Sequence, residues 1–382
     1  MYVSIRTDSS IEIGTGHTMR CLTLAEALQK MGAEVSFICR DGPGNINSFI
    51  EKRGFIVYRL PPIQMERSQE EWNVQDAVES LTIIKKHAPI DWLIVDHYTL
   101  DWRWEQSMRG YAKKIMVVDD LADRRHDCDL LLDQNLHHQM DTRYQTRLMR
   151  DCRLLLGPKY AMLRPQFYFQ RQKMKKPNGE VRRIHICFGG SDPTNQTLRA
   201  LEAIASLDDK RWSIDVVVGR ANPFSDEVKK ACSRIPGASF FGHVDDMATL
   251  LADSDLAIGG GGSSTWERCC LGVPSLIISI ANNQTAASQE CHRRQLIRYL
   301  GAYDQVTTQQ INKELIRMAT DKKELLSLRA RGMEMVDGLG VTRVCLLLLG
   351  ESLQSKTDVE VEQQFFRIYD ISKNKCGKEG IG

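Results

Sequence analysis

The feature that most constrains this chain is an alternation of short apolar runs with longer amphipathic runs. In the N-terminal half, β-type runs lie at residues 2–6, 33–40, 55–60, 91–98 and 114–121. The stretch after the first run places Met19, Leu22, Ala25 and Leu28 on one helical stripe. Strands that alternate with helices predict a parallel sheet covered by helices on both faces.

A polar, basic segment at residues 170–183, QRQKMKKPNGEVRR, separates this series from a second one. Its composition is typical of an interdomain linker. The second series is expected to end with a last strand within residues 271–284. We therefore predict five parts: an N-terminal α/β domain at 1–169, a linker at 170–183, a second α/β domain at 184–335, a helix packing across the domain boundary at 336–352, and a tail without an assigned role at 353–382.

The most informative turn is IEIGTGHTMR at residues 11–20, between the first strand and the first helix. Gly14 and Gly16 permit a tight turn, and His17 falls where the helix should begin. The positive end of a helix disfavours an imidazolium, so His17 should stay neutral and able to accept a proton. Alternatively, His17 only makes a loop hydrogen bond. The turn also partly matches a dinucleotide fingerprint, but Arg20 replaces the third glycine.

Polar residues follow several of the predicted strands where the strands end. In parallel sheets such positions line the ligand crevice. By this reasoning the crevice residues are His17, Asp96, His97, Asp119, Asp120 and Asn135. A metal-hydrolase site built from Asp96, His97, Asp119, Asp120 and His126 is an alternative, although these residues lack a ligand pattern such as H-E-x-x-H.

A second glycine-rich turn, GGGGSSTWE at residues 259–267, follows another predicted strand. Free N–H groups and hydroxyls at such a helix start suit a diphosphate. The turn is not a P-loop, because the lysine of that motif is missing. Glu267 could accept hydrogen bonds from ribose hydroxyls, or it could be a first-turn carboxylate favoured by the helix dipole.

The net charge of +2 argues against a nucleic-acid or membrane surface that relies on bulk charge. The 11 cysteines are an odd number without a C-x-x-C pair, which favours reduced thiols and a cytoplasmic location. We recognise no signal region and no apolar run long enough to span a membrane. We expect a monomer that needs no cofactor and no metal.

At this point the residues resemble a known family, the UDP-sugar hydrolases of pseudaminic-acid biosynthesis, whose substrate is UDP-2,4-diacetamido-2,4,6-trideoxy-β-L-altropyranose. The resemblance covers about residues 2–300, and spore-coat polysaccharide proteins share the same pattern. It rests on matching stretches at residues 5–25, 96–98, 118–124, 132–135, 156–167, 188–193, 258–275 and 281–284.

The resemblance implies a GT-B-like fold, with two Rossmann-type parallel-sheet domains facing a central cleft. It implies that the N-terminal domain holds the sugar, that the C-terminal domain holds UDP, and that His17 is the general base that activates water. UDP is a good leaving group, so one base should suffice and the anomeric carbon should be inverted. Asp8 is a candidate to orient the imidazole, although the sequence alone leaves the orienting residue open. The candidate substrate-binding residues are Asp8, Gly14, Gly16, Arg20, Asp96, His97, Tyr98, Gly190, Ser191, Gly262, Ser263, Ser264, Thr265, Glu267, Asn283 and Gln284.

Two further functions compete with hydrolysis. A UDP-sugar-dependent glycosyltransferase of surface or spore-coat polysaccharide synthesis would direct an acceptor hydroxyl, instead of water, to the same crevice. A non-catalytic nucleotide-sugar-binding or scaffold protein would not need His17. Release of free sugar without an acceptor separates the first of these from hydrolysis.

Overall fold

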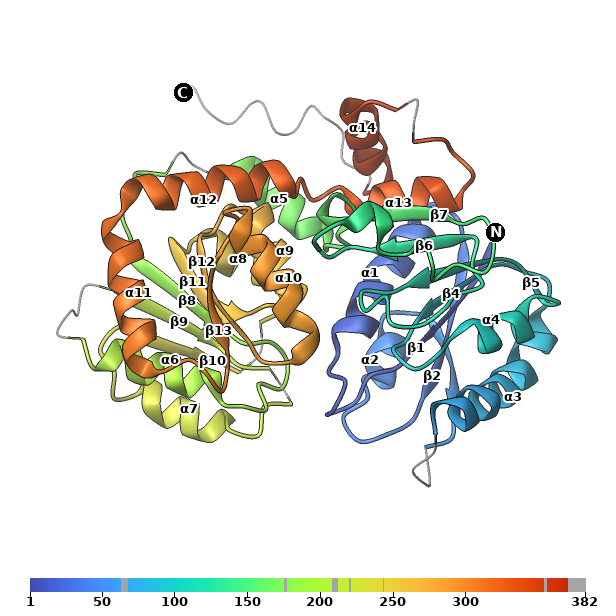
Figure 1. The fold of residues 1–382 in the computed structure, drawn as a ribbon, viewed down its shortest axis with the longest axis horizontal. Coiled ribbons are helices and arrows are strands. Elements are labelled where there is room, and N and C mark those ends of the chain that lie inside the picture. The colour runs from blue at the N-terminus through green and yellow to red at the C-terminus, as the bar shows by residue number, and fades with distance from the viewer. Residues whose placement is uncertain are drawn as a thin grey trace. The chain divides into compact units, whose positions relative to one another are not determined.

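The computed structural model describes residues 1–62, 68–174, 177–207, 212–219, 221–242, 244–353 and 356–369. The chain folds into two compact units, each built on a parallel sheet (Figure 1). The first unit contains residues 1–134, 140–163 and the described residues from Leu339 onward. The second contains residues 135–139 and 164–338.

The first unit has a seven-stranded sheet in the order β3-β2-β1-β4-β5-β6-β7. Its strands are β1 (Tyr2–Thr7), β2 (Glu34–Arg40), β3 (Ile56–Leu60), β4 (Ile90–Asp96), β5 (Ala112–Val118), β6 (Leu130–Asp133) and β7 (Arg153–Leu156). Its helices are α1 (Gly16–Lys30), α2 (Asn47–Lys52), α3 (Gln69–His87), α4 (Trp102–Met108), α13 (Gly340–Leu348) and α14 (Asp358–Ile368), with 3-10 turns at Met140–Thr142 and Pro158–Tyr160. The alternating pattern of the sequence therefore gives the predicted parallel sheet.

Two apolar clusters lie in this unit. One joins β1 and β2 to α1 and α13 through residues such as Ile5, Phe37 and Val344. The other joins β4 and β5 to α3 and α4 through residues such as Leu93 and Trp104. Helices thus cover both faces of the sheet, and each fully buried aliphatic or aromatic side chain contributes roughly 1.5–3 kcal/mol.

From Leu339 onward the chain returns to the first unit. Helix α13 packs against α1, although the two are far apart in the sequence (Figure 1). Helix α14 begins with a capping box between Thr357 and Glu360 and packs against α13. Part of the segment predicted as a tail is therefore an ordered helix, with Val361 and Phe365 buried; residues 370–382 lie outside the described chain. That the 336–352 segment packs across a domain boundary stays a prediction.

The second unit has a six-stranded sheet in the order β10-β9-β8-β11-β12-β13. Its strands are β8 (Arg183–Cys187), β9 (Ser213–Val217), β10 (Ala238–Phe241), β11 (Leu256–Gly260), β12 (Ser275–Ser279) and β13 (Arg298–Ala302). Its helices are α5 (Pro165–Lys173), α6 (Gln196–Ala205), α7 (Ser225–Cys232), α8 (Met247–Ala252), α9 (Ser264–Cys270), α10 (Asn282–Arg293), α11 (Thr308–Thr320) and α12 (Lys322–Met335).

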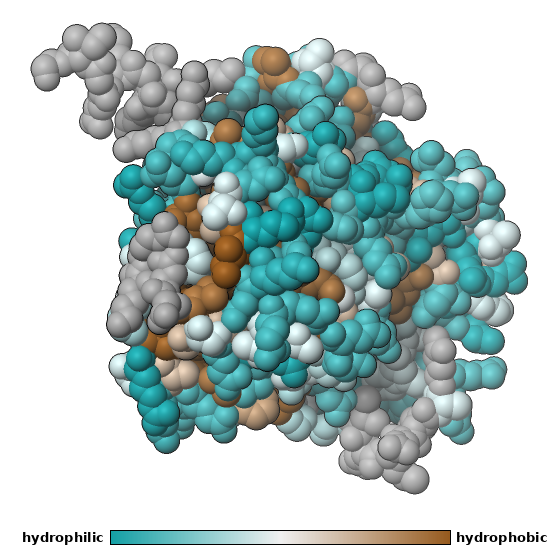
Figure 2. Space-filling model, turned by 60° about the vertical axis from the view of Figure 1, so that its left-hand side comes forward, coloured by the Kyte–Doolittle hydropathy of each residue, from teal (hydrophilic) through white to brown (hydrophobic). Residues whose placement is uncertain are grey.

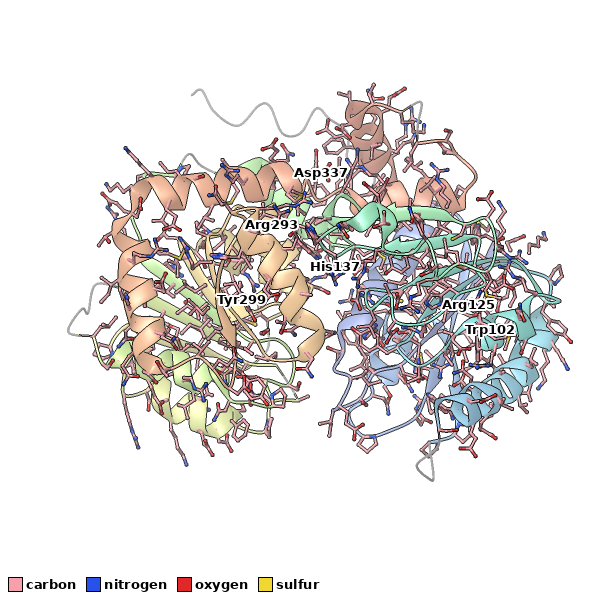
Figure 3. All side chains as sticks on the ribbon, in the orientation of Figure 1. Trp102, Arg125, His137, Arg293, Tyr299 and Asp337 are labelled. Atoms are coloured by element: carbon pink, nitrogen blue, oxygen red, sulfur yellow. The ribbon has the colours of Figure 1, made fainter. Side chains whose placement is uncertain are left out.

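One expectation for this unit is wrong. The strand predicted to be last, β12, is followed by a further strand, β13, which contains Tyr299 (labelled in Figure 3). The Tyr299 hydroxyl lies 2.7 Å from Ser279 Oγ at the end of β12. Part of the predicted linker is helical, because α5 runs to Lys173. Helix α5 stays in place because Phe167 and Tyr168 are buried and Arg171 donates hydrogen bonds to the carbonyls of Cys270 and Met333, both at 2.8 Å.

The helices place their polar faces outward, and the face seen in Figure 2 is mostly hydrophilic, with smaller hydrophobic areas. Within the described ranges, no helix combines the length and the apolar character that crossing a bilayer requires.

Candidate active site

The loop between β1 and α1 forms the centre of the site in the first unit. Ser10 Oγ accepts hydrogen bonds from the backbone N–H groups of Glu12 (3.2 Å) and Ile13 (3.1 Å), and the Gly14 N–H donates to the Ser10 carbonyl at 2.9 Å. Gly14 has a φ of 74°, a left-handed conformation that favours glycine. Helix α1 then begins at Gly16, so His17 occupies the first turn as predicted.

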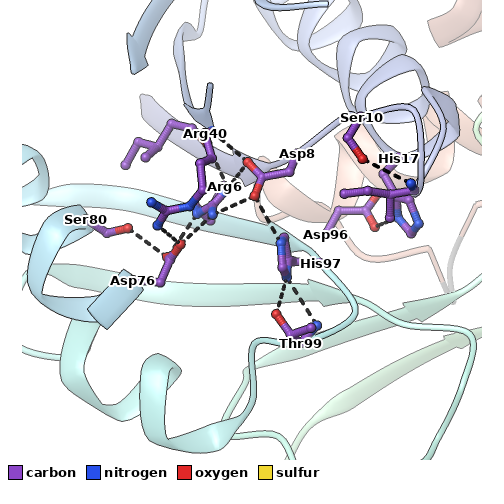
Figure 4. A network of polar contacts seen from close by, with 12 residues as sticks. Arg6, Asp8, Ser10, His17, Arg40, Asp76, Ser80, Asp96, His97 and Thr99 are labelled. Atoms are coloured by element: carbon purple, nitrogen blue, oxygen red, sulfur yellow. Dashed lines mark hydrogen bonds and ion pairs between the residues drawn. The ribbon is translucent and has the colours of Figure 1, made fainter. Parts of the chain in front are cut away.

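His17 forms a close pair with Asp96, which ends β4 (Figure 4). The distance between His17 Nδ1 and Asp96 Oδ1 is 2.6 Å, and the imidazole is 7% exposed. A bare ring nitrogen facing a carboxylate at this distance would be repelled, so Nδ1 carries the proton and donates it. Nε2 then holds the free lone pair, and no partner for it occurs in the described part of the chain. This is the arrangement of a base with an orienting carboxylate.

Arg20, one turn after His17, holds the same carboxylate. Its Nε lies 2.6 Å from Asp96 Oδ2 and its Nη2 lies 2.7 Å from Oδ1. Burial of Asp96 opposes ionisation, but the charges of Arg20 and His17 and their hydrogen bonds hold the Asp96 pKa well below its usual value. Asp96 is therefore a permanent carboxylate. The Tyr98 ring meets the His17 ring edge-on, with centroids 4.3 Å apart.

The expectation that Asp8 orients His17 is wrong. Asp8 accepts hydrogen bonds from Arg6, from the Arg40 backbone N–H (2.7 Å) and from His97 Nε2 (3.1 Å). The His97 Nδ1 accepts from the Thr99 N–H at 3.2 Å. Both nitrogens of His97 are thus engaged, unlike those of His17 (Figure 4). Burial opposes ionisation of Asp8 too, yet Arg6 and His97 keep its pKa well below the usual value.

A cavity of about 690 Å³ opens beside these residues, within the usual range for small-molecule sites. Of the candidate residues, the structure brings Asp8, His17, Asp96, His97 and Tyr98 to its wall. Gly14 and Gly16 shape the turn, whereas Arg20 lies behind Asp96. The remaining wall consists of Ser9, Ser10, Ile11, Glu12, Ile13, Arg40, Asp41, Gly42, Pro43, Pro62, Trp72 and Thr99.

Sequence reasoning missed one wall of this cavity. The Arg40 guanidinium stacks over the Trp72 ring, 4.4 Å from its centroid, and pairs with Asp76 at 2.7 Å. Asp76 also pairs with Arg6, and Arg6 with Asp8, so one ionic network supports this side (Figure 4). The available signal was a pair of arginines, Arg6 and Arg40, at the ends of otherwise apolar strands.

The second candidate region is the turn between β11 and α9. Gln284, in the first turn of α10, holds it: its Oε1 accepts from the N–H groups of Gly261 and Ile280, both at 3.1 Å. A Cβ at position 261 would lie 2.3 Å from Ser288 Oγ, so any larger residue there would force the Ser288 side chain or the turn to move. The NNQ segment, residues 282–284, thus begins helix α10, and Gln284 supports the glycine turn.

The other candidates of this unit lie at the same edge of the sheet. Ser263, Ser264, Thr265 and Glu267 follow Gly262 into α9, and Asn283 lies beside Gln284. Burial raises the pKa of the Glu267 carboxyl above its usual value, although the positive charge of Arg164 acts in the opposite direction. Arg164 Nη2 lies 3.6 Å from Glu267 Oε1.

Gly190 and Ser191 follow β8, which pairs with β11 through Cys187 and Gly259. The backbone of Gly190 packs against Gly219, where a Cβ would lie 2.1 Å from the Gly190 carbonyl oxygen. The two turns therefore leave neighbouring strands at the carboxyl edge, where α/β sheets bind ligands.

The residues of the metal alternative have other partners. His126 Nδ1 lies 2.7 Å from Glu105 Oε1, and Asp119 pairs with Arg124 at 2.9 Å. Across the described residues, no group of three or more His, Cys, Asp or Glu side chains is placed to hold a metal ion.

Comparison with known proteins adds relatives that span most of the chain. An uncharacterised protein of Methanocaldococcus jannaschii is 29% identical over 76% of this chain, which spans little more than half (57%) of that protein. The spore coat polysaccharide biosynthesis protein SpsG of Bacillus subtilis is 26% identical, covering 91% of this chain and 98% of SpsG. The UDP-2,4-diacetamido-2,4,6-trideoxy-β-L-altropyranose hydrolase of Campylobacter jejuni, PseG, is 27% identical, covering 75% and 95%. The chain is thus similar to PseG and to SpsG over most of its length. No protein-family model matches it.

Solved structures establish the fold class of this chain. MurG of Acinetobacter baumannii superposes with a TM-score of 0.64 at 14% identity, covering 91% of this chain and 99% of MurG. The UDP complex of Staphylococcus aureus MnaA gives a TM-score of 0.61 at 11% identity, covering 94% and 99%. The chain has two Rossmann-type parallel sheets, and its structural neighbours are GT-B proteins. The fold is therefore GT-B-like, as predicted.

Proposed function

We propose that this PseG-like chain hydrolyses a UDP-linked di-N-acetylated 6-deoxy sugar, releasing UDP and free sugar for nonulosonic (pseudaminic) acid biosynthesis. The observation that carries the proposal is the His17–Asp96 pair, which leaves Nε2 as a free base on the wall of a sugar-sized cavity. The choice of substrate is supported by the Campylobacter jejuni relative, which is named as the hydrolase of such a UDP-sugar and matches this chain over nearly its whole length.

In the proposed reaction, His17 Nε2 accepts a proton from water as the water oxygen attacks the anomeric carbon. The bond from that carbon to the diphosphate oxygen breaks, and its electron pair leaves with UDP. Because attack and departure occur on opposite faces, the configuration inverts. Asp96 stabilises the imidazolium that forms, and Arg20 keeps Asp96 ionised and in place.

The proposed roles of the other candidates follow from their places. Asp8, His97 and Tyr98 contact the sugar from the cavity wall, while Gly14 and Gly16 let the backbone approach it closely. The turns at Gly190–Ser191 and Gly262–Thr265 hold the diphosphate, with Glu267, Asn283 and Gln284 at the nucleoside. UDP leaves as a stable anion, so the mechanism needs no second carboxylate as general acid.

The test is a panel of UDP-sugars incubated with the protein and followed by mass spectrometry. Hydrolysis predicts free sugar and UDP without any added acceptor, with the diacetamido trideoxy sugar turned over fastest. If sugar is released only when an acceptor alcohol is present, the chain is a glycosyltransferase and the proposal fails.

A further inference from the structure

Arg268 on α9 is a buried cation with no carboxylate partner. It is 2% exposed, and its guanidinium donates to the Gly260 carbonyl (2.7 Å), Thr265 Oγ1 (3.1 Å) and Ser264 Oγ (3.1 Å). Its Nε has no hydrogen-bond partner, and no ion pair to Arg268 occurs among the described residues. The adjacent carboxylate, Glu267, lies near Arg164 instead.

This isolation sets Arg268 apart from the other buried arginines of the described chain. Each of those pairs with a carboxylate within 4 Å: Arg6 with Asp8 and Asp76, Arg20 with Asp96, Arg40 with Asp76, Arg124 with Asp119, and Arg343 with Asp358. A buried charge without a counterion is unfavourable, so proteins rarely keep one unless something else compensates it.

The neighbours of Arg268 show where compensation can come from. All three of its acceptors belong to the glycine-rich turn and the first residues of α9, so the guanidinium lies directly against that turn. The titratable residue behind it, His185 on β8, is buried with an unpartnered Nδ1; burial and the charge of Arg268 lower its pKa to about 3. His185 therefore stays neutral. The charge of Glu267 acts on Arg268, but no carboxylate of the described chain makes an ion pair with the guanidinium.

We propose that Arg268 is a buried countercharge for the diphosphate of the bound nucleotide. The proposal rests on the nucleotide site proposed above and assigns Arg268 a positioning role. Its charge acts through the Gly260–Thr265 turn, where low polarity strengthens the attraction to an anion on the turn's outer face.

The experiment measures the affinities of uridine, UMP and UDP by calorimetry. The proteins are the full-length wild type, Arg268→Gln, Arg268→Met and Arg268→Lys. Losing the charge should weaken UDP binding by about 10–100-fold, the usual range for an interaction with a charged group. Uridine binding should change less than about threefold, because uridine carries no phosphate. Arg268→Lys keeps the charge and should retain most of the preference for UDP over uridine.

Arg293→Gln is the matched control, since Arg293 is an exposed arginine of the same unit, paired with Glu290 at 2.7 Å. It should leave all three affinities unchanged. Arg268→Met offers an apolar replacement of similar length should Arg268→Gln not fold, because buried ions are often replaceable by apolar groups.

Equal losses for uridine and UDP would show that Arg268 only shapes the turn, and undiminished UDP binding would show that its charge is irrelevant. Either result overturns the inference but leaves the nucleotide site intact. A wild-type protein that does not prefer UDP to uridine would overturn both proposals.

Discussion

Replacing Asp96 with Asn tests how the base is built. The carboxylate accepts the His17 Nδ1–H at 2.6 Å and two hydrogen bonds from Arg20. Asn has one acceptor oxygen for these donors, and its amide N–H₂ would face either His17 or Arg20. An amide N–H facing His17 favours the tautomer with its proton on Nε2, which cannot accept a proton from water.

The magnitude follows from the two roles of Asp96. A wrong tautomer in a comparable acid–base site lowers kcat by about 10⁴-fold, and general-base catalysis as a whole is worth about 10²–10⁴-fold. We therefore expect kcat to fall by at least about 10²-fold. Arg20, only 6% exposed, would keep only its longer contact with Asp120 (3.5 Å), and breaking a buried ion pair removes up to about 3–5 kcal/mol of stability.

The assay compares kcat and the free energy of unfolding for the wild type, Asp96→Asn and Arg20→Gln/Asp96→Asn. The double variant should recover part of the stability, because it removes the buried cation that has lost its main partner, yet it should stay inactive. If Asp96→Asn kept kcat within about threefold of the wild type, Asp96 would not set the tautomer of His17.

Two other predictions concern packing and pH. Gly261→Ala should destabilise the protein by about 1–3 kcal/mol and weaken UDP binding, because the new Cβ would lie 2.3 Å from Ser288 Oγ. The double variant Gly261→Ala/Ser288→Ala should recover most of the stability and most of the UDP affinity. If it recovers neither, the close approach to Ser288 is not the cause. Asp76 is buried, which opposes ionisation, but Arg6 lowers its pKa to about 2 from 3.8. A carboxyl whose pKa is lower in the folded than in the unfolded protein stabilises the fold at pH values above its unfolded pKa. About 2 kcal/mol of stability should therefore be lost as the pH falls from about 4 to about 2. Urea unfolding should show the gap between wild type and Asp76→Asn narrowing over that range, and a constant gap would contradict the argument.

The sequence predicts the helix-start position of His17 because that position is local. A strand, two glycines and an amphipathic run lie within residues 2–30. The partner of His17 is not local. Asp96 reaches it because β4 lies next to β1, with Thr7 opposite Asp96. Strand alternation does not specify which strands pair, so Asp8, close in sequence, was the natural but wrong choice.

The second unit shows the same limit. The strand β13, RYLGA, has too weak a pattern to be recognised alone, and it is ordered by pairing with β12 and by the Tyr299 hydroxyl. The pattern of Asn282–Gln284 does not predict that the Gln284 side-chain oxygen accepts hydrogen bonds from the backbone N–H groups of Gly261 and Ile280. The sequence likewise does not predict that Arg268 lacks an ion pair, because that depends on which side chains surround it in the fold.

The central claim is that His17 activates water for attack at the anomeric carbon. The most direct measurement is turnover of the UDP-sugar in ¹⁸O-water by wild type and His17→Asn, with His97→Gln as a control whose ring nitrogens are both engaged in the native protein. The label should enter the sugar at its anomeric carbon, and kcat should fall by about 10²–10⁴-fold in His17→Asn but much less in His97→Gln. UDP binding should barely change. Label on the UDP phosphate, or near-normal turnover by His17→Asn, would contradict the account.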